Sequence, residues 1–126
     1  MDRREFMVVV AAGMVLLNDQ EKATPMYGLI GKMNAAPGQR DALIAILLEG
    51  TAKMPGCLSY IVAKDTTDAN AIWITEVWDA EASHQASLAL PAVQAAIAKA
   101  RPMITGFGER FITTPLGGVG LTTGKQ

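Results

Sequence analysis

Histidine and cysteine are nearly absent from this sequence of 126 residues, which contains one of each, His84 and Cys57. A lone histidine cannot build a multi-histidine metal centre. A lone cysteine excludes both an intrachain disulfide and a cysteine-rich zinc site. The sequence also lacks a glycine-rich loop of the kind that holds phosphate groups. We therefore expect a protein that uses neither a metal nor an organic cofactor.

Charge is scarce as well. Only 18% of the residues are charged, and 11 basic against 12 acidic side chains give a net charge of −1. Because there is no basic surplus to meet a phosphate backbone, we expect no nucleic-acid partner. Half of the chain is hydrophobic, and its length suits one domain. That apolar surface must be buried in one core or between copies of the chain.

The N-terminal segment, residues 1–23, contains an apolar run from Phe6 to Leu17 that follows Arg3 and Arg4. The run is too short to span a bilayer as a helix. With its two arginines it resembles a twin-arginine export signal, which predicts a periplasmic protein with no membrane attachment in its mature form. If the segment is not a signal, we expect a cytoplasmic protein in which it packs as an extra strand or helix on the domain or on a neighbouring chain.

Two β-rich runs form the centre of the remaining chain. Residues 58–63 and 71–78 are joined by the polar, turn-prone segment 64–70, which predicts an antiparallel hairpin. Side-chain alternation divides the second run between two sheet faces. One face carries Ile72, Ile74, Glu76 and Trp78, and the other carries Trp73, Thr75 and Val77. Because both faces are bulky, we expect helices on the first and a second copy of the sheet on the other.

The order of the expected elements is β-α-β-β-α-β. Strands are expected at residues 26–33 and 106–114, and helices at 39–53, 80–90 and 91–101. Asp79 is placed to cap the second helix, and Pro91 interrupts that helix and starts the third. This order predicts a ferredoxin-like α+β domain over residues 24–116, with all of its helices on one face of an antiparallel sheet. Residues 117–126 are expected to form a tail.

Three short motifs carry a resemblance to a known family. The runs P-G-C-x-x-Y at 55–60, I-T-E-V-W-D at 74–79 and L-A-L-P-A-V at 88–93 are similar to the antibiotic biosynthesis monooxygenase (ABM) domain family. The resemblance extends from Met26 to about Pro115. It implies a homodimer in which two ferredoxin-like sheets form an α+β barrel. Members of the family include cofactor-independent monooxygenases of quinols and polycyclic phenols, relatives that bind and degrade haem, and proteins of unknown role.

The resemblance and the strand pattern together select the candidate site. Trp78 matches the tryptophan of the family's E-x-W motif and is expected to face the pocket, either as a substrate contact or as a core aromatic. Tyr60 on the adjacent strand is a second candidate for substrate binding. Glu76 would have a raised pKa if it were buried beside Trp78 and would then serve as a base. The favoured interpretation of Glu76 is instead an ion pair with a lysine or arginine on a neighbouring strand.

The helix after the hairpin supplies the remaining candidates. Haem-degrading relatives carry an iron-ligating histidine at the fourth residue before the proline, and the equivalent position here is Ser87. His84 lies one turn earlier on the same helical stripe and is expected to reach the same cavity as a catalytic residue. Ser87 is then a substrate contact.

Two functions of different kinds fit these residues. The first is a monooxygenase that oxidises a quinol or polycyclic phenol with O2, for which a dry apolar pocket, one base and one hydrogen bond suffice. The second is a non-catalytic module that binds a small aromatic ligand or serves in a stress response. Haem binding or degradation ranks third, because Ser87 replaces the histidine.

Overall fold

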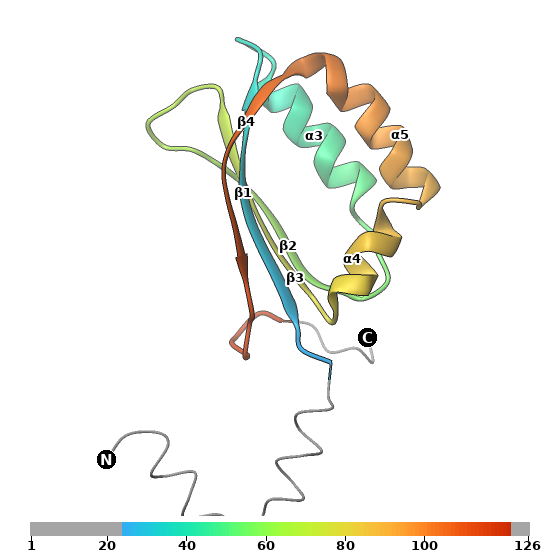
Figure 1. Ribbon diagram of the computed structural model, residues 1–126. Helices are drawn as coiled ribbons and strands as arrows, with labels where there is room; N and C mark the ends of the chain where they lie inside the picture. The colour runs from blue at the N-terminus through green and yellow to red at the C-terminus, as the bar shows by residue number, and fades with distance from the viewer. Residues whose placement is uncertain (1–23, 122–126) are drawn as a thin grey trace, which may run out of the picture.

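The computed structural model describes residues 24–121, which form a four-stranded antiparallel sheet in the order β2-β3-β1-β4 with helices on one face (Figure 1). The strands are β1 (Tyr27–Ala35), β2 (Cys57–Lys64), β3 (Ala71–Trp78) and β4 (Ile104–Thr113). The helices are α3 (Arg40–Gly50), α4 (Glu81–Ser87), α5 (Pro91–Ala100) and the single 3-10 turn η2 (Arg101–Met103). This arrangement confirms the ferredoxin-like α+β fold. The signal-like segment, residues 1–23, and residues 122–126 of the expected tail lie outside the described residues.

The central hairpin has the two faces that the alternation predicts. In β3 the side chains of Ile72, Ile74 and Trp78 are buried. Strand β2 pairs with β3 so that Tyr60 lies opposite Glu76. Tyr60 therefore shares the helix-covered face with Glu76, because directly paired residues of antiparallel strands point to the same side. Hereafter the face toward the helices is the inner face and the opposite one is the outer face.

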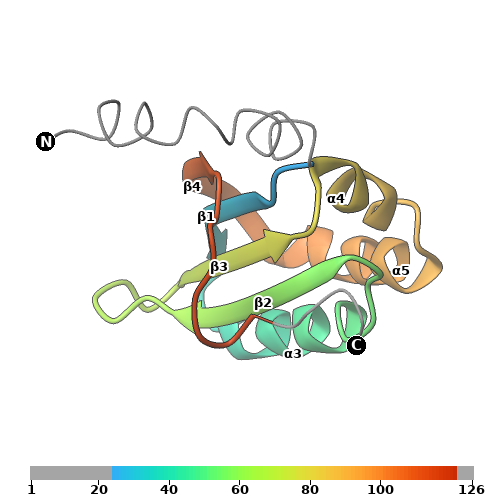
Figure 2. The same ribbon diagram turned by 90° about the horizontal axis from the view of Figure 1, so that it is seen from below.

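Helices α3 and α5 lie side by side over the inner face, and both views place them on the same side of the sheet (Figures 1 and 2). Leu43 and Leu47 of α3 join Ile72 and Ile74 in the main core cluster. A glycine permits the close helix contact: a Cβ built on Gly50 would lie 2.3 Å from the Cβ of Ala96. Helices α3 and α5 therefore pack closely where α3 ends.

The helix that follows β3 differs from the expectation. Asp79 does not cap it: the N-cap position is Ala80, whose extended backbone delays the helix by one residue, and no side chain caps the helix. Asp79 instead accepts a hydrogen bond from the hydroxyl of Ser83, with its Oδ1 2.5 Å from Oγ. The helix also ends at Ser87 rather than at 90. The expected break at Pro91 is confirmed, with Pro91 opening α5.

The outer face carries apolar side chains, and no helix in residues 24–121 covers them. The strand pairings align Ile61, Thr75, Ile30 and Phe111 in one row across all four strands. Ile61 is 55% exposed and Phe111 52% exposed. None of the helices in the described part of the chain is long and apolar enough to cross a membrane. This row lies on the same face as Trp73 and Val77, the face that the sequence predicts to be covered by a second copy of the sheet.

Candidate functional site

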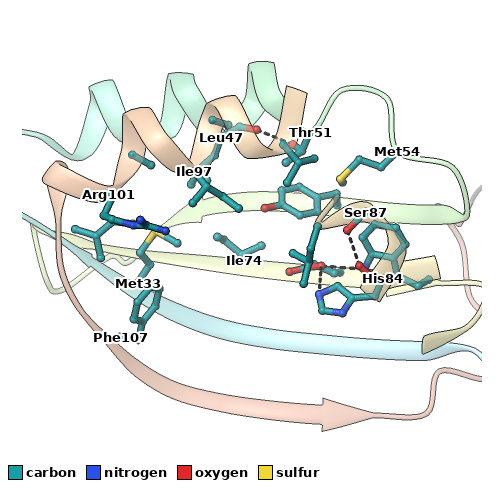
Figure 3. Close-up of a pocket in the computed structure, with 18 of the residues that line it drawn as sticks. Met33, Leu47, Thr51, Met54, Ile74, His84, Ser87, Ile97, Arg101 and Phe107 are labelled. Carbon is teal, nitrogen blue, oxygen red and sulfur yellow. Dashed lines mark hydrogen bonds and ion pairs between the residues drawn. The ribbon is translucent and has the colours of Figure 1, made fainter. Parts of the chain in front are cut away.

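A cavity of about 600 Å³ lies between the inner face of the sheet and the helices (Figure 3). Its size is within the range usual for small-molecule sites, and most of its lining is apolar. Apolar or weakly polar side chains from every layer contribute to it, namely Met33, Leu47, Met54, Ile74, Leu88, Val93, Ile97, Ile104 and Phe107. The expected site residues Tyr60, Glu76, Trp78, His84 and Ser87 all line this one cavity. Their roles stay predictions, but the fold brings them together.

The carboxylate of Glu76 is held by the indole of Trp78. Trp78 Nε1 donates a hydrogen bond to Glu76 Oε1 at 2.9 Å. The two residues are neighbours on the inner face because they are two positions apart on β3. Trp78 itself is 1% exposed and belongs to a small core cluster with Tyr27 and Leu29. The carboxylate therefore has a rigid, buried partner that fixes its orientation.

His84 approaches the same carboxylate from α4. Its Nε2 lies 3.9 Å from Glu76 Oε1, and both side chains are only 12% exposed. The imidazole packs against Tyr27 and Trp78, with ring centroids 5.4 Å and 5.5 Å away. Within residues 24–121 its Nδ1 is buried without a hydrogen-bond partner. Since buried polar atoms are nearly always hydrogen-bonded, this nitrogen is available to a ligand.

Burial raises the pKa of Glu76 above its usual value, whereas the hydrogen bond from Trp78 and the charges of His84 and Arg110 lower it. Burial prevails, so the proton binds more tightly than on an exposed glutamate. In the part of the chain that the structure describes, no lysine or arginine lies within ion-pair distance of Glu76, whereas His84 Nε2 lies 3.9 Å from its Oε1. Of the two expectations for Glu76, the arrangement favours a proton acceptor of raised pKa over a Lys or Arg ion pair.

Tyr60 and Cys57 flank the carboxylate on β2. Burial and then the charge of Glu76 raise the pKa of the Tyr60 phenol well above its usual range, so the phenol stays protonated and is a donor. Burial likewise raises the pKa of the Cys57 thiol, whose Sγ lies 3.5 Å from the carbonyl oxygen of Ser59. Tyr60 is thus suited to donate to an anionic ligand oxygen, whereas Cys57 is not poised as a nucleophile.

Ser87 does not fit the haem-ligand position of haem-degrading relatives. Its side chain is 5% exposed, and its hydroxyl donates to the backbone oxygen of His84 at 2.6 Å. A hydroxyl engaged with its own helix offers haem iron no imidazole nitrogen. No group of three or more His, Cys, Asp or Glu side chains in residues 24–121 is arranged to hold a metal ion.

The far end of the cavity contains residues that the sequence did not indicate as part of a site. Figure 3 places Arg101, Met33 and Phe107 at one end and Met54, Ser87 and His84 at the other. Arg101 begins η2 at the end of α5, and a basic residue at a helix C-terminus has an ordinary local explanation in the helix dipole. No motif in the sequence therefore indicated that it lines the cavity.

The ferredoxin-like sheet has an apolar cavity under its helices, and inside that cavity a largely buried carboxylate lies beside an imidazole. These features define an α+β domain with a candidate small-molecule site. The sequence profile of the family named Antibiotic biosynthesis monooxygenase matches residues 26–99. The chain belongs to that family. A crystal structure of a family member from Chloroflexus aurantiacus J-10-fl is 66% identical, with a TM-score of 0.75, covering 76% of this chain and 98% of the other.

More distant structures share the fold. A family member from Caulobacter crescentus CB15 is 16% identical with a TM-score of 0.68, covering 80% of this chain and 99% of its own. SnoaB from Streptomyces nogalater, a cofactor-independent oxygenase solved as its N63A mutant, is 16% identical with a TM-score of 0.60, covering 76% and 98%. A search of curated proteins found no match.

Proposed function

We propose that this protein is a cofactor-independent monooxygenase that oxidises a quinol or polycyclic phenol with O2. The observation that carries the proposal is the placement of Glu76, with a raised pKa and a fixed orientation, at one end of an apolar cavity of about 600 Å³. Family membership and the fold shared with the oxygenase SnoaB support it. A fused aromatic ring matches the apolar walls, and its hydroxyl matches the polar end.

The first step is removal of the substrate's hydroxyl proton. Glu76 accepts it, either directly or relayed by His84, whose Nε2 lies 3.9 Å from the carboxylate oxygen Oε1. A phenolate is far more electron-rich than a phenol, so deprotonation prepares the ring to reduce O2. Tyr60, kept protonated by its raised pKa, donates a hydrogen bond to the phenolate oxygen.

The remaining steps need no reactant other than the substrate and O2. The phenolate ring transfers an electron to O2, and recombination forms a carbon–oxygen bond to a ring carbon that carries hydrogen, which gives a peroxide anion. This anion takes back the proton that Glu76 accepted in the first step and becomes a hydroperoxide. Loss of water from that carbon leaves a carbonyl, so one oxygen atom enters the quinone and the other leaves as water. The substrate is the reductant and O2 the oxidant. The protein contributes deprotonation, orientation and exclusion of bulk water.

Two further proposals concern the setting of this reaction. Two copies associate through the outer face and thereby cover the apolar row that includes Ile61 and Phe111.

Residues 1–23 direct export by the twin-arginine route. Replacing Arg3 and Arg4 by lysine would then retain the protein in the cytoplasm, and wild-type protein found there at full length and soluble would contradict the export proposal.

Oxygen uptake measured on purified protein tests the proposed activity. A panel of anthrones, naphthols and naphthohydroquinones is added with and without protein, and O2 consumption is compared with quinone formation. The expected result is protein-dependent uptake of one O2 for each quinone formed from a phenol. Ligand binding without oxygen uptake on any member of the panel would overturn the proposal and favour the non-catalytic binding module.

A further inference from the structure

We infer that the substrate carries an anionic group, such as a carboxylate, at the end of its ring system opposite the reacting hydroxyl, and that Arg101 binds this group. The inference rests on the proposed function, since it assigns the far end of that substrate. Arg101 and the Glu76–His84 pair line the same cavity. They contribute a positive charge to one end and a proton-accepting pair to the other.

The guanidinium of Arg101 has no partner among the described residues. No hydrogen bond or ion pair from its side chain is present in residues 24–121, although the backbone N–H of Arg101 bonds the carbonyl of Ile97. Lys99 already places a positive charge in the last turn of α5, so Arg101 is not needed to complement the helix dipole. A planar guanidinium at the wall of an apolar cavity is suited to bind a carboxylate through two parallel hydrogen bonds.

The two ends of the cavity, at Arg101 and at Glu76, are far enough apart for one ligand to reach both. Met33 lies at the Arg101 end in Figure 3 and pairs with Ile72, whereas Glu76 pairs with Leu29. Four residues along a strand correspond to about 14 Å at roughly 3.4 Å per residue. A fused-ring phenol with a substituent at its far end spans that distance, with apolar walls between.

The charges also fix the direction of the ligand. An anionic group beside Glu76 would meet a carboxylate in a poorly hydrated site, where like charges repel strongly. At the other end it meets Arg101. The same ligand without its anionic group would lose the attraction and retain the apolar contacts.

Binding measured without oxygen tests this inference separately from turnover. The probe is a naphthoate with its hydroxyl at the opposite end of the ring system, and the reference is the neutral naphthamide of the same shape. Arg101 is exposed, so solvent weakens its attraction for an anion. Wild-type protein should therefore bind the naphthoate only about threefold to fivefold more tightly than the naphthamide. Arg101→Gln should abolish that preference without weakening naphthamide binding, Arg101→Lys should retain part of it, and about 0.5 M salt should reduce it.

Lys99→Gln is the matched control, since it removes an exposed positive charge two residues away that does not line the cavity. It should leave the preference unchanged. The inference is overturned if wild-type protein does not prefer the naphthoate, if Arg101→Gln keeps the preference, or if Arg110→Gln abolishes it instead. Failure to oxidise any phenol would leave these binding results intact and would count against the proposed function alone.

Discussion

Trp78 donates its indole N–H to the carboxylate of Glu76, two residues earlier on the same strand, across 2.9 Å. The bond uses the only polar group of the tryptophan, so the indole offers a ligand only its ring surface. A donor to a carboxylate stabilises the charged form. Trp78 is therefore a positioning residue that keeps Glu76 oriented and limits the rise in its pKa caused by burial.

Replacing Trp78 by phenylalanine tests this relationship. Loss of the N–H removes a bond to the ionised form, so the pKa of Glu76 should rise further. A hydrogen bond to a charged group contributes about 1.5–3 kcal/mol, which corresponds to a shift of about one unit or more. The acidic limb of the plot of kcat/KM against pH should shift to higher pH by that amount. The value of kcat/KM at high pH should change less.

Trp73→Phe is the control for that experiment. It removes the N–H that Trp73 donates to Asp65 at 2.8 Å on the outer face and leaves Glu76 untouched. Its acidic limb should coincide with that of the wild type. An unshifted limb in Trp78→Phe would mean that Glu76 is not the group that titrates.

Strand-level features of this site were predictable, whereas contacts between layers were not. The alternation of β3 places Glu76 and Trp78 on one face whatever surrounds them, and Pro91 interrupts a helix by its own chemistry. The approach of His84 to Glu76 depends instead on the turn after Trp78. There Ala80 is extended and Asp79 bonds Ser83 rather than capping the helix.

The dimer proposal predicts that a charge on the outer face prevents association. Phe111→Glu places a carboxylate in the apolar row where the partner sheet would cover it, and an unpaired buried charge is strongly unfavourable. By sedimentation at micromolar concentration, wild-type protein should be a dimer and the variant a monomer. Leu116→Glu, at a 90% exposed position beyond β4, should remain a dimer. A monomeric wild type would contradict the proposal.

Glu76 makes stability depend on pH in a defined direction. Its pKa in the folded protein is raised above the ordinary 4.5, so the folded state binds the proton more tightly than the unfolded state. The free energy of unfolding should therefore fall as pH rises from about 4.5 through the folded pKa. Glu76→Gln removes this loss and keeps an oxygen that accepts from Trp78.

Urea denaturation at several pH values measures that effect. The stability of Glu76→Gln relative to wild type should increase as pH rises above 4.5 and then level off. Asp65 does not interfere with this measurement. Hydrogen bonds from Trp73, Thr67 and Asp68 lower its pKa, so its contribution to stability is lost only as pH falls below the ordinary pKa of 3.8. A stability difference that is constant with pH would show that the pKa of Glu76 is not raised.

The contact between α3 and α5 predicts a sensitive position at Gly50. An added methyl group would meet the Cβ of Ala96 at 2.3 Å, so the helices must separate. Gly50→Ala should lower the free energy of unfolding by about 1–3 kcal/mol despite the better helix propensity of alanine. Gly31→Ala, where no atom lies within 4 Å of the added carbon, is the control and should change stability much less. Equal stability of both variants would contradict the close packing.

The most direct test of the proposed chemistry is the steady-state rate of phenol oxidation by wild type, Glu76→Gln and His84→Phe. The glutamine retains the shape and the bond to Trp78, and the phenylalanine retains ring packing against Tyr27 and Trp78. General-base catalysis contributes about 10²–10⁴ in rate, so both variants should lose kcat/KM in that range while remaining folded and dimeric. Full activity in both would contradict the assignment of the Glu76–His84 pair as the catalytic base.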